Sequence, residues 1–265
     1  TSNVRLGVNA GDSIVSGGNY NVVVGDEAGT ALTTGDSNIA VGFEALLTED
    51  ANSFNVAVGH QALKVNNGGD ANVAIGYQAL VANTTAANNV AVGNGAMAAN
   101  TTGTLNVAVG TAALDANTTA SNNVAVGYNS LGANTTGAGN TAVGTNSLDA
   151  NTTANNNTAV GADALSAATT GHSNTAVGKE AGEALTTGVS TVFIGSGAGE
   201  AATTGDYNVG VGADSLTALT TGSSNVAVGY NALTANTTAT GNTAVGSSSM
   251  QSTTTGASNV AMGLY

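Results

Sequence analysis

The side chains that most often carry catalysis are few in this chain and do not converge. Its two histidines, His60 and His172, occupy variable positions far apart in the sequence. Serine is common, but no serine has the neighbouring base and orienting acid that a hydroxyl nucleophile requires. Cysteine is absent, which excludes disulfide bonds and thiolate metal sites. The sequence therefore predicts no catalytic residue and no enzymatic activity.

Two further patterns look like ligand sites without completing them. The segment 195–199, Gly-Ser-Gly-Ala-Gly, looks like a phosphate-binding loop but lacks the lysine and the strand-then-helix context. Acidic residues recur after a repeated glycine, yet they form no motif that supplies the six or more oxygens that calcium takes. Asn-Thr-Thr triplets such as the one at Asn83 match the N-glycosylation pattern, and we interpret them as a recurring turn. We expect no metal and no cofactor.

Aromatic side chains are the candidates for contact with a ligand. Tyr77, Tyr128 and Tyr230 share the position after the repeated glycine, and Phe43 and His60 occupy it too. Such rings offer a flat apolar surface with a polar tip, which suits a sugar. Two interpretations stay open: the rings cover the corner of the next repeat, or the tyrosines contact a glycan.

These residues are positioned by a strict internal repeat. From Asn21 to Asn259 the chain repeats a seventeen-residue unit without insertion or deletion. A period this short predicts one solenoid coil per repeat, because a slip of one residue would turn every side chain in the stack. We expect an all-β solenoid, a parallel β-roll or β-helix, with a degenerate N-terminal coil at 1–20, fourteen coils at 21–258 and a truncated final coil at 259–265.

The second half of each coil is harder to assign. Most coils read Ala-Leu here, and where glycine replaces the leucine at Gly29 or Gly182, a leucine follows three residues later at Leu32 or Leu185. Positions three apart share one face of a helical turn. We therefore allow a short helical turn in each coil, with a second β-segment as the alternative.

Two invariant positions predict a structural ladder. The leading asparagine is replaced once, by Thr191, and stacked asparagines can hydrogen-bond along the axis. The repeated glycine indicates a corner that needs positive φ or a close backbone approach. The ladder residues we single out are Asn72, Asn89, Asn106, Asn123, Gly76, Gly93, Gly110 and Gly127.

Side chains alternate along the short strand that joins these two positions. We expect the second and fourth positions, such as Val73 and Ile75, to face the coil interior and the third position to face outward. The third position is nearly always alanine, which predicts close packing between chains. At this position Phe193 in one coil is followed by Gly210 in the next, so a large residue lies beside a small one and the total volume is kept. The predicted interchain residues are Ala74, Ala91, Ala108, Ala125, Phe193 and Gly210.

Charge and hydropathy exclude other classes of partner. The 16 acidic residues face only three basic ones, giving a net charge of −13. With no basic stripe we expect no nucleic-acid binding. No apolar run approaches the ~20 residues of a membrane helix, so we expect no membrane insertion.

The repeats resemble those of two related groups of fibrous proteins. The Asn-Val-Ala-Ile-Gly segment at 72–76 resembles the head repeats of trimeric autotransporter adhesins. The longer unit, which continues through Tyr-Gln-Ala-Leu to Asn-Thr-Thr at 83–85, is similar to head-type repeats of bacteriophage tail fibres. Adhesin heads usually have a shorter coil with Ser-x-Ala in place of Ala-Leu.

The resemblance implies parallel β-rolls that assemble as a homotrimer. It also implies a structural and adhesive fibre segment on a virion tail or an extracellular cell surface, with a host surface glycan or receptor as partner. The alternative is an ice-binding β-solenoid, because the Thr-Thr pairs recur in step with the coils. A polysaccharide-degrading spike would need paired carboxylates in a groove, which the short turns do not provide.

Overall fold

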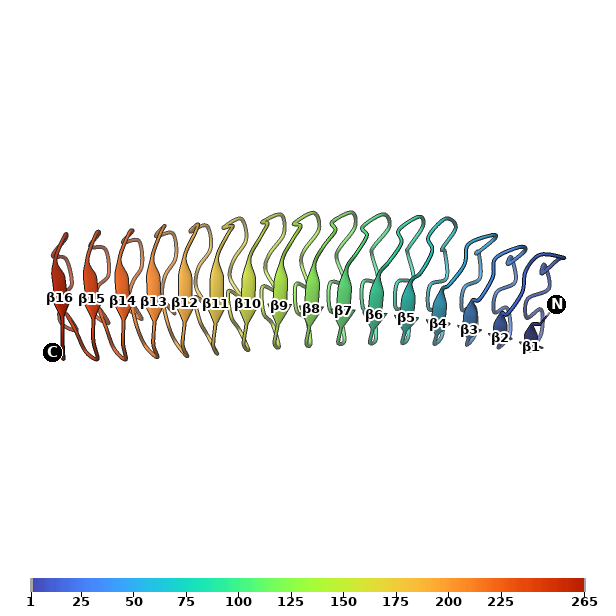
Figure 1. Cartoon of the computed structure of the whole chain (residues 1–265), viewed down its shortest axis with the longest axis horizontal. Coiled ribbons are helices and arrows are strands. Elements are labelled where there is room, and N and C mark those ends of the chain that lie inside the picture. The colour runs from blue at the N-terminus through green and yellow to red at the C-terminus, as the bar shows by residue number, and fades with distance from the viewer. Residues whose placement is uncertain (1, 265) are drawn as a thin grey trace. The chain divides into compact units, whose positions relative to one another are not determined.

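The computed structural model describes residues 2–264 as an all-β parallel solenoid of about 15 coils (Figure 1). Each coil contributes one strand of three residues. The strands are β1 (Val4–Leu6), β2 (Val22–Val24), β3 (Ile39–Val41), β4 (Val56–Val58), β5 (Val73–Ile75), β6 (Val90–Val92), β7 (Val107–Val109), β8 (Val124–Val126), β9 (Thr141–Val143), β10 (Thr158–Val160), β11 (Thr175–Val177), β12 (Val192–Ile194), β13 (Val209–Val211), β14 (Val226–Val228), β15 (Thr243–Val245) and β16 (Val260–Met262).

The chain divides into two compact units, Thr1–Thr136 and Gly137–Tyr265. Strands β1–β8 lie in the first unit and β9–β16 in the second, and within each unit consecutive strands pair in parallel. The register sets each residue beside the one seventeen positions on, as in Val73↔Val90. The first pair alone differs among the described pairs, because Val4 pairs with Val22 across eighteen residues. One seventeen-residue repeat therefore forms one coil of the solenoid.

The strands face the opposite way from the sequence prediction. The third-position alanines Ala74, Ala91, Ala108 and Ala125 have no exposed surface in the single chain. Second- and fourth-position side chains such as Val73 and Ile75 lie on the outside. The prediction that the alanine column packs between chains is wrong, since those side chains are enclosed within their own coil.

Phe193 and Gly210 belong to the same enclosed column, so their predicted interchain role is wrong as well. They are paired neighbours on β12 and β13. The Phe193 ring fills the coil interior, and a Cβ added at Gly199 would lie 2.5 Å from it. Added Cβ atoms at Gly182 and Gly210 would lie 3.0 and 3.2 Å from the ring. Three glycines therefore make room for one large side chain inside a thin core.

The second half of each coil is a stacked turn, and the described residues include no helix. Gln78 and Leu80 have φ of 53° and 51°, in the left-handed region. The Gln78 N–H donates to the His60 carbonyl of the preceding coil at 3.0 Å, and the Leu80 N–H donates to the Ala96 carbonyl of the following coil at 3.0 Å. A helical turn needs consecutive negative φ values, so alternating left-handed residues replace it. The allowed helical turn is therefore not present.

The corner glycines combine two features that favour glycine, a positive φ and a close approach to the backbone of the next coil. Gly76 has φ of 138°, a conformation that other residues rarely adopt. A Cβ at Gly76 would also fall on the carbonyl of Gly93 in the next coil. Gly93, Gly110 and Gly127 have the same conformation, with φ of 140°, 140° and 135°. Each coil can therefore sit directly on the next one at this corner.

The core of each coil is thin and built from small residues. Ala74 on the strand and Ala79 and Leu80 on the turn have no exposed surface. The equivalent leucines of other coils, such as Leu63 and Leu114, are equally buried. Stacking buries these side chains against their copies in adjacent coils, which is how a solenoid obtains a continuous core.

Candidate functional site

The leading asparagines form a buried ladder that joins side chain to backbone. The Asn72 Oδ1 accepts the backbone N–H of Asn89 at 3.0 Å, and the Asn89 Oδ1 accepts that of Asn106 at 3.0 Å. The Asn106 Oδ1 in turn accepts the N–H of Asn123 at 2.9 Å. The amide nitrogens of Asn72, Asn89 and Asn106 each donate to a backbone carbonyl fourteen residues on, as Asn72 Nδ2 does to Ala86 at 2.8 Å. The ladder thus satisfies buried backbone groups between coils.

A second buried amide column lies at the asparagines of the Asn-Thr-Thr triplets. Asn83 Nδ2 donates to Asn66 Oδ1 at 2.7 Å, and Asn100 Nδ2 donates to Asn83 Oδ1 at 3.1 Å. These asparagines have no exposed surface, so they cannot accept a glycan in the folded chain. In the first unit the column begins at Glu49, whose carboxylate accepts from Asn66 Nδ2. Burial raises the pKa of the Glu49 carboxyl.

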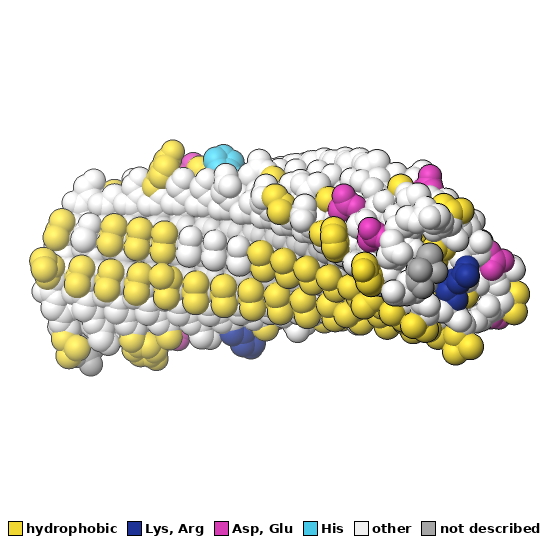
Figure 2. All heavy atoms as spheres, turned by 45° about the vertical axis from the view of Figure 1, so that its right-hand side comes forward, with side chains coloured by type: hydrophobic (Ala, Val, Ile, Leu, Met, Phe, Trp, Pro, Cys, Tyr) yellow, Lys and Arg dark blue, Asp and Glu magenta, His cyan; other side chains and the backbone are white. Residues whose placement is uncertain are grey.

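An aliphatic face runs along the outer side of the strands in each unit. We define it as the second- and fourth-position side chains of β2–β16. All of the fourth positions are aliphatic or methionine, and the second positions are valine or isoleucine except Thr141, Thr158, Thr175 and Thr243. Within each unit Figure 2 shows them as two adjacent rows of hydrophobic side chains, and in the second unit polar residues interrupt one of the rows. None of the strand residues from β2 onward is charged.

The aliphatic face is partly open to solvent in the single chain. Ile75 and Ile194 are each 39% exposed, and Val228 is 36% exposed. Parallel sheets are usually covered on both faces. Continuous apolar surface on a soluble chain usually marks an interaction site. The aliphatic face is therefore the main candidate surface for association with another protein.

The three predicted glycan-contact tyrosines lie at the surface in separate coils. Tyr77, Tyr128 and Tyr230 are 49%, 59% and 55% exposed. The structure does not bring Tyr77 and Tyr128 together, since they belong to the coils of β5 and β8. It does bring Tyr77 beside His60, with ring centroids 5.4 Å apart, and His60 beside Phe43, with centroids 5.2 Å apart. We call Phe43, His60 and Tyr77 the aromatic row.

A polar row follows the aromatic row at the next position of the same three coils. Gln78 Nε2 donates to Gln61 Oε1 at 2.9 Å, and Gln61 Nε2 donates to Glu44 Oε2 at 2.8 Å. Lys64 Nζ lies 2.6 Å from the same Glu44 oxygen. The Lys64 ammonium and the Gln61 amide lower the pKa of the Glu44 carboxyl. Sequence reasoning missed this polar row, although its seventeen-residue spacing could have revealed it.

At the other end of the strands, the position just before the ladder asparagine carries an exposed apolar side chain in several coils. These side chains are Tyr20 and Phe54, 68% and 63% exposed, and Leu105 and Tyr207, 56% and 61% exposed. Sequence reasoning missed these residues too, although they share one position of the repeat. Exposed rings therefore occur on both margins of the strands.

The two threonines of each pair have different environments. Thr84 Oγ1 donates to the Thr101 carbonyl at 3.0 Å, and Thr101 Oγ1 donates to the Thr118 carbonyl at 3.0 Å. The second threonine of each pair, such as Thr85 and Thr102, is exposed. The pairs thus present one file of exposed threonines per unit, while the hydroxyls of the other file bind the next coil.

Catalytic and metal-binding groups do not come together in residues 2–264. His172 is exposed, and its Nδ1 lies 3.3 Å from the Oγ of its chain neighbour Ser173. The described residues include no group of three or more His, Cys, Asp or Glu side chains that could hold a metal ion. The segment 195–199 forms a corner and a turn, in which Gly199 makes room for Phe193.

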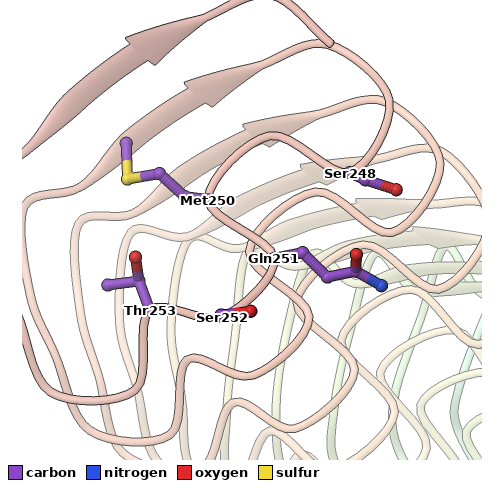
Figure 3. Close-up of a pocket in the computed structure, with 5 residues that line it drawn as sticks. All are labelled: Ser248, Met250, Gln251, Ser252 and Thr253. Atoms are coloured by element: carbon purple, nitrogen blue, oxygen red, sulfur yellow. The ribbon is translucent and has the colours of Figure 1, made fainter. Parts of the chain in front are cut away.

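The hollows of the surface are shallow and poor in reactive groups. One of about 350 Å³ is lined by Ser248, Met250, Gln251, Ser252 and Thr253 (Figure 3). In Figure 3 Met250 and Gln251 point to different sides of the chain. None of these five side chains titrates in the physiological range. This hollow therefore carries no evident chemistry.

A second hollow, of about 360 Å³, is lined by Ser166, Glu183 and Glu200 with three alanines. Burial and the nearby Glu180 charge raise the pKa of the Glu183 carboxyl. Two carboxylates offer fewer ligands than a cation site requires. This hollow does not define a site either.

Comparison with family models gives no match for this chain, and comparison with curated proteins gives no similar sequence. In the part of the chain that the structure describes, no helix has the length and hydropathy of a membrane span. The assignment of function therefore depends on the surfaces described above.

Proposed function

We propose that this chain is a structural and adhesive fibre segment of the phage tail-fibre or surface-adhesin type. In this proposal three copies assemble side by side through the aliphatic face and attach to a cell surface. The chain then belongs on a virion tail or outside a cell. The number three comes from the resemblance of the repeats to trimeric heads, and the contact surface comes from the fold.

The single observation that carries this proposal is the uncharged aliphatic face on a parallel sheet. Side chains such as Val92 and Val109 recur on it in consecutive coils. Covering them with a second copy removes apolar area from water at roughly 25 cal/mol per Å². Because the acidic side chains from β2 onward lie on turns, the net charge of −13 is kept off this face.

The oligomeric mass in solution tests the assembly. Light scattering on the eluting protein should give about three times the chain mass of 25.2 kDa at micromolar concentration. The association should strengthen with sulfate, which favours burial of apolar surface. A single-chain mass at all concentrations would refute assembly through the aliphatic face.

Ice binding is the second candidate, and the file of exposed threonines favours it. Thr85, Thr102 and Thr119 are exposed at one position of consecutive coils. The hydroxyls of the neighbouring file are engaged with backbone carbonyls, which leaves a regular array only one residue wide. Thermal hysteresis at micromolar protein, lost in Thr102→Lys, would favour this function over the fibre. The absence of thermal hysteresis would rule out ice binding.

A further inference from the structure

The aromatic row ends at a gap in the surface of the first unit. After Phe43, His60 and Tyr77, the next coil carries Asn94 at the aromatic position and Gly95 at the position of the polar row. A Cβ built on Gly95 would meet no atom within 4 Å. The coil after Tyr77 therefore leaves open the space that a longer side chain would occupy.

The Tyr77 ring lies one coil before this gap. Tyr77 is stacked with His60 at an interplanar angle of 24°, and His60 belongs to the preceding coil. The opposite face of the ring is consequently turned toward the coil of Asn94 and Gly95. Tyr77 and Asn94 are both exposed, so a ligand can reach this face from solvent.

Polar groups suited to a hydroxylated ligand border the same gap. Gln78 lies beside Tyr77, and its NH2 group donates to Gln61 Oε1 at 2.9 Å. The carbonyl oxygen of the Gln78 amide is then the atom that can accept from a ligand hydroxyl. The Asn94 amide can both donate and accept. An aromatic face flanked by two amides matches the alternating apolar and hydroxyl surfaces of a pyranose ring.

The charges of the chain favour a neutral sugar over an acidic one. The nearby cation, Lys64, is paired with Glu44 at 2.6 Å, and the chain carries a net charge of −13. An acidic sugar would meet repulsion from the chain without a free cation to bind it. The ligand that fits the gap is therefore uncharged.

We propose that the gap bounded by Tyr77, Gln78, Asn94 and Gly95 is a binding site for a neutral hexopyranose unit of a cell-surface glycan. The sugar packs one face on Tyr77, and its hydroxyls exchange hydrogen bonds with Gln78 and Asn94. This site rests on the proposed adhesive function, for which it supplies the ligand class and the contact residues. A single small site of this kind binds in the millimolar range, and several copies on one fibre raise the avidity.

A substitution that fills the gap tests the site without removing any contact. Gly95→Gln continues the polar row, and Gly95 has φ of 64°, close to the 58° and 53° of Gln61 and Gln78. The fold therefore accepts glutamine at this position. The matched control is Ala112→Gln, at the same position one coil further on and with φ of 54°. Maltotriose, cellotriose and N-acetylated chitotriose serve as neutral probes, with sialyllactose as the acidic probe.

Binding is measured by NMR saturation transfer and titration of the wild-type chain and both variants. We expect at least one neutral probe to bind the wild type and Ala112→Gln equally, Gly95→Gln to bind at least tenfold more weakly, and sialyllactose not to bind. Equal binding by Gly95→Gln would overturn the site, as would the failure of all neutral probes to bind the wild type. Preferred binding of sialyllactose would overturn the ligand class.

A second pair of variants separates a ring contact from a general effect on the surface. Tyr77→Ala should lose at least tenfold in affinity, whereas Tyr128→Ala, at the equivalent position of a coil without an aromatic neighbour, should retain it. Equal loss in both would overturn the assignment to Tyr77. The oligomeric mass of each variant is measured in parallel. A trimer that binds no neutral sugar overturns this site alone, and a monomer that binds through Tyr77 overturns the fibre assembly alone.

Discussion

At the scale of single residues, Glu49 is the most unusual group in the chain. It occupies the place that asparagine takes in the following coils, and it has no exposed surface. Its Oε1 accepts the Asn52 N–H at 2.9 Å and its Oε2 accepts from Asn66. Burial raises the pKa of its carboxyl, because water stabilises the charged form better than the coil does.

The raised pKa sets the sign of a pH effect on stability. The folded chain holds the Glu49 proton more tightly than the unfolded chain does. The stabilising contribution is present below the ordinary glutamate pKa of about 4.3 and is lost as the pH rises through the raised folded value. Glu49 therefore weakens the first unit at neutral pH.

We expect Glu49→Gln to stabilise the chain by about 1 kcal/mol at pH 7, because removing the buried charge outweighs the loss of one of the two hydrogen bonds that the carboxylate accepts, since an amide has a single accepting oxygen. This gain in the free energy of unfolding should become smaller as the pH is lowered toward 4. Thermal unfolding followed by circular dichroism at both pH values checks this, with Glu27→Gln, on a partly exposed turn, as the control. A lower melting temperature for Glu49→Gln than for wild type at pH 7 would contradict the argument.

At the scale of the coil, the asparagine ladder is the element that fixes one repeat above the next. It has one substitution in the second unit, at Thr191. The Thr191 N–H and Oγ1 both donate to Asn174 Oδ1, at 2.9 and 3.0 Å. Elsewhere an asparagine also donates from Nδ2 to a carbonyl fourteen residues on, as Asn174 does to Gly188 at 2.8 Å.

Thr191→Asn should therefore extend the ladder through β12. The new amide can donate to the Gly205 carbonyl and accept the Asn208 N–H, for a gain of about 1 kcal/mol. The reverse change, Asn225→Thr, removes the bonds to Ala239 and Asn242 and should destabilise by about 1–3 kcal/mol. Denaturant unfolding of both variants measures the difference. The prediction fails if Thr191→Asn lowers the midpoint.

At the scale of the whole molecule, association depends on the face that the fold turns outward. Alanine side chains face the interior and valine side chains face solvent, so the trimer that we propose meets through larger, branched residues. These residues offer more apolar area per coil than alanine would. A chain that separates from the other two copies should therefore keep its folded coils.

Val109→Glu places a charge on the aliphatic face, and it should weaken association at least tenfold while preserving the circular dichroism spectrum, because the side chain lies outside the core. Thr102→Glu adds the same charge at an exposed turn position and should leave the mass unchanged. Sedimentation velocity over a concentration series measures both. Dissociation by Thr102→Glu with Val109→Glu unaffected would place the interface elsewhere.

The sequence alone determined the period and the consequences of strict register. The seventeen-residue spacing predicted the parallel solenoid and placed Phe193 beside Gly210. The same spacing also carries the second asparagine column at Asn66 and Asn83 and the polar row at Gln61 and Gln78. These contacts were predictable in principle, because residues one period apart must be neighbours in any stack of equal coils.

Only the tertiary structure decided which side of the strand is inside and how the coil turns. Alternation divides the strand into an alanine set and a valine set, and both are apolar, so hydropathy could not rank them. The interior of the coil is narrow: where Val23 takes the place of the alanine, Gly29 takes that of the leucine, and a Cβ added at Gly29 would lie 3.3 Å from the Val23 side chain. The left-handed φ at Gln78 and Leu80 is likewise imposed by hydrogen bonds to adjacent coils rather than by local preference, which is why a helical turn was expected where a stacked turn exists.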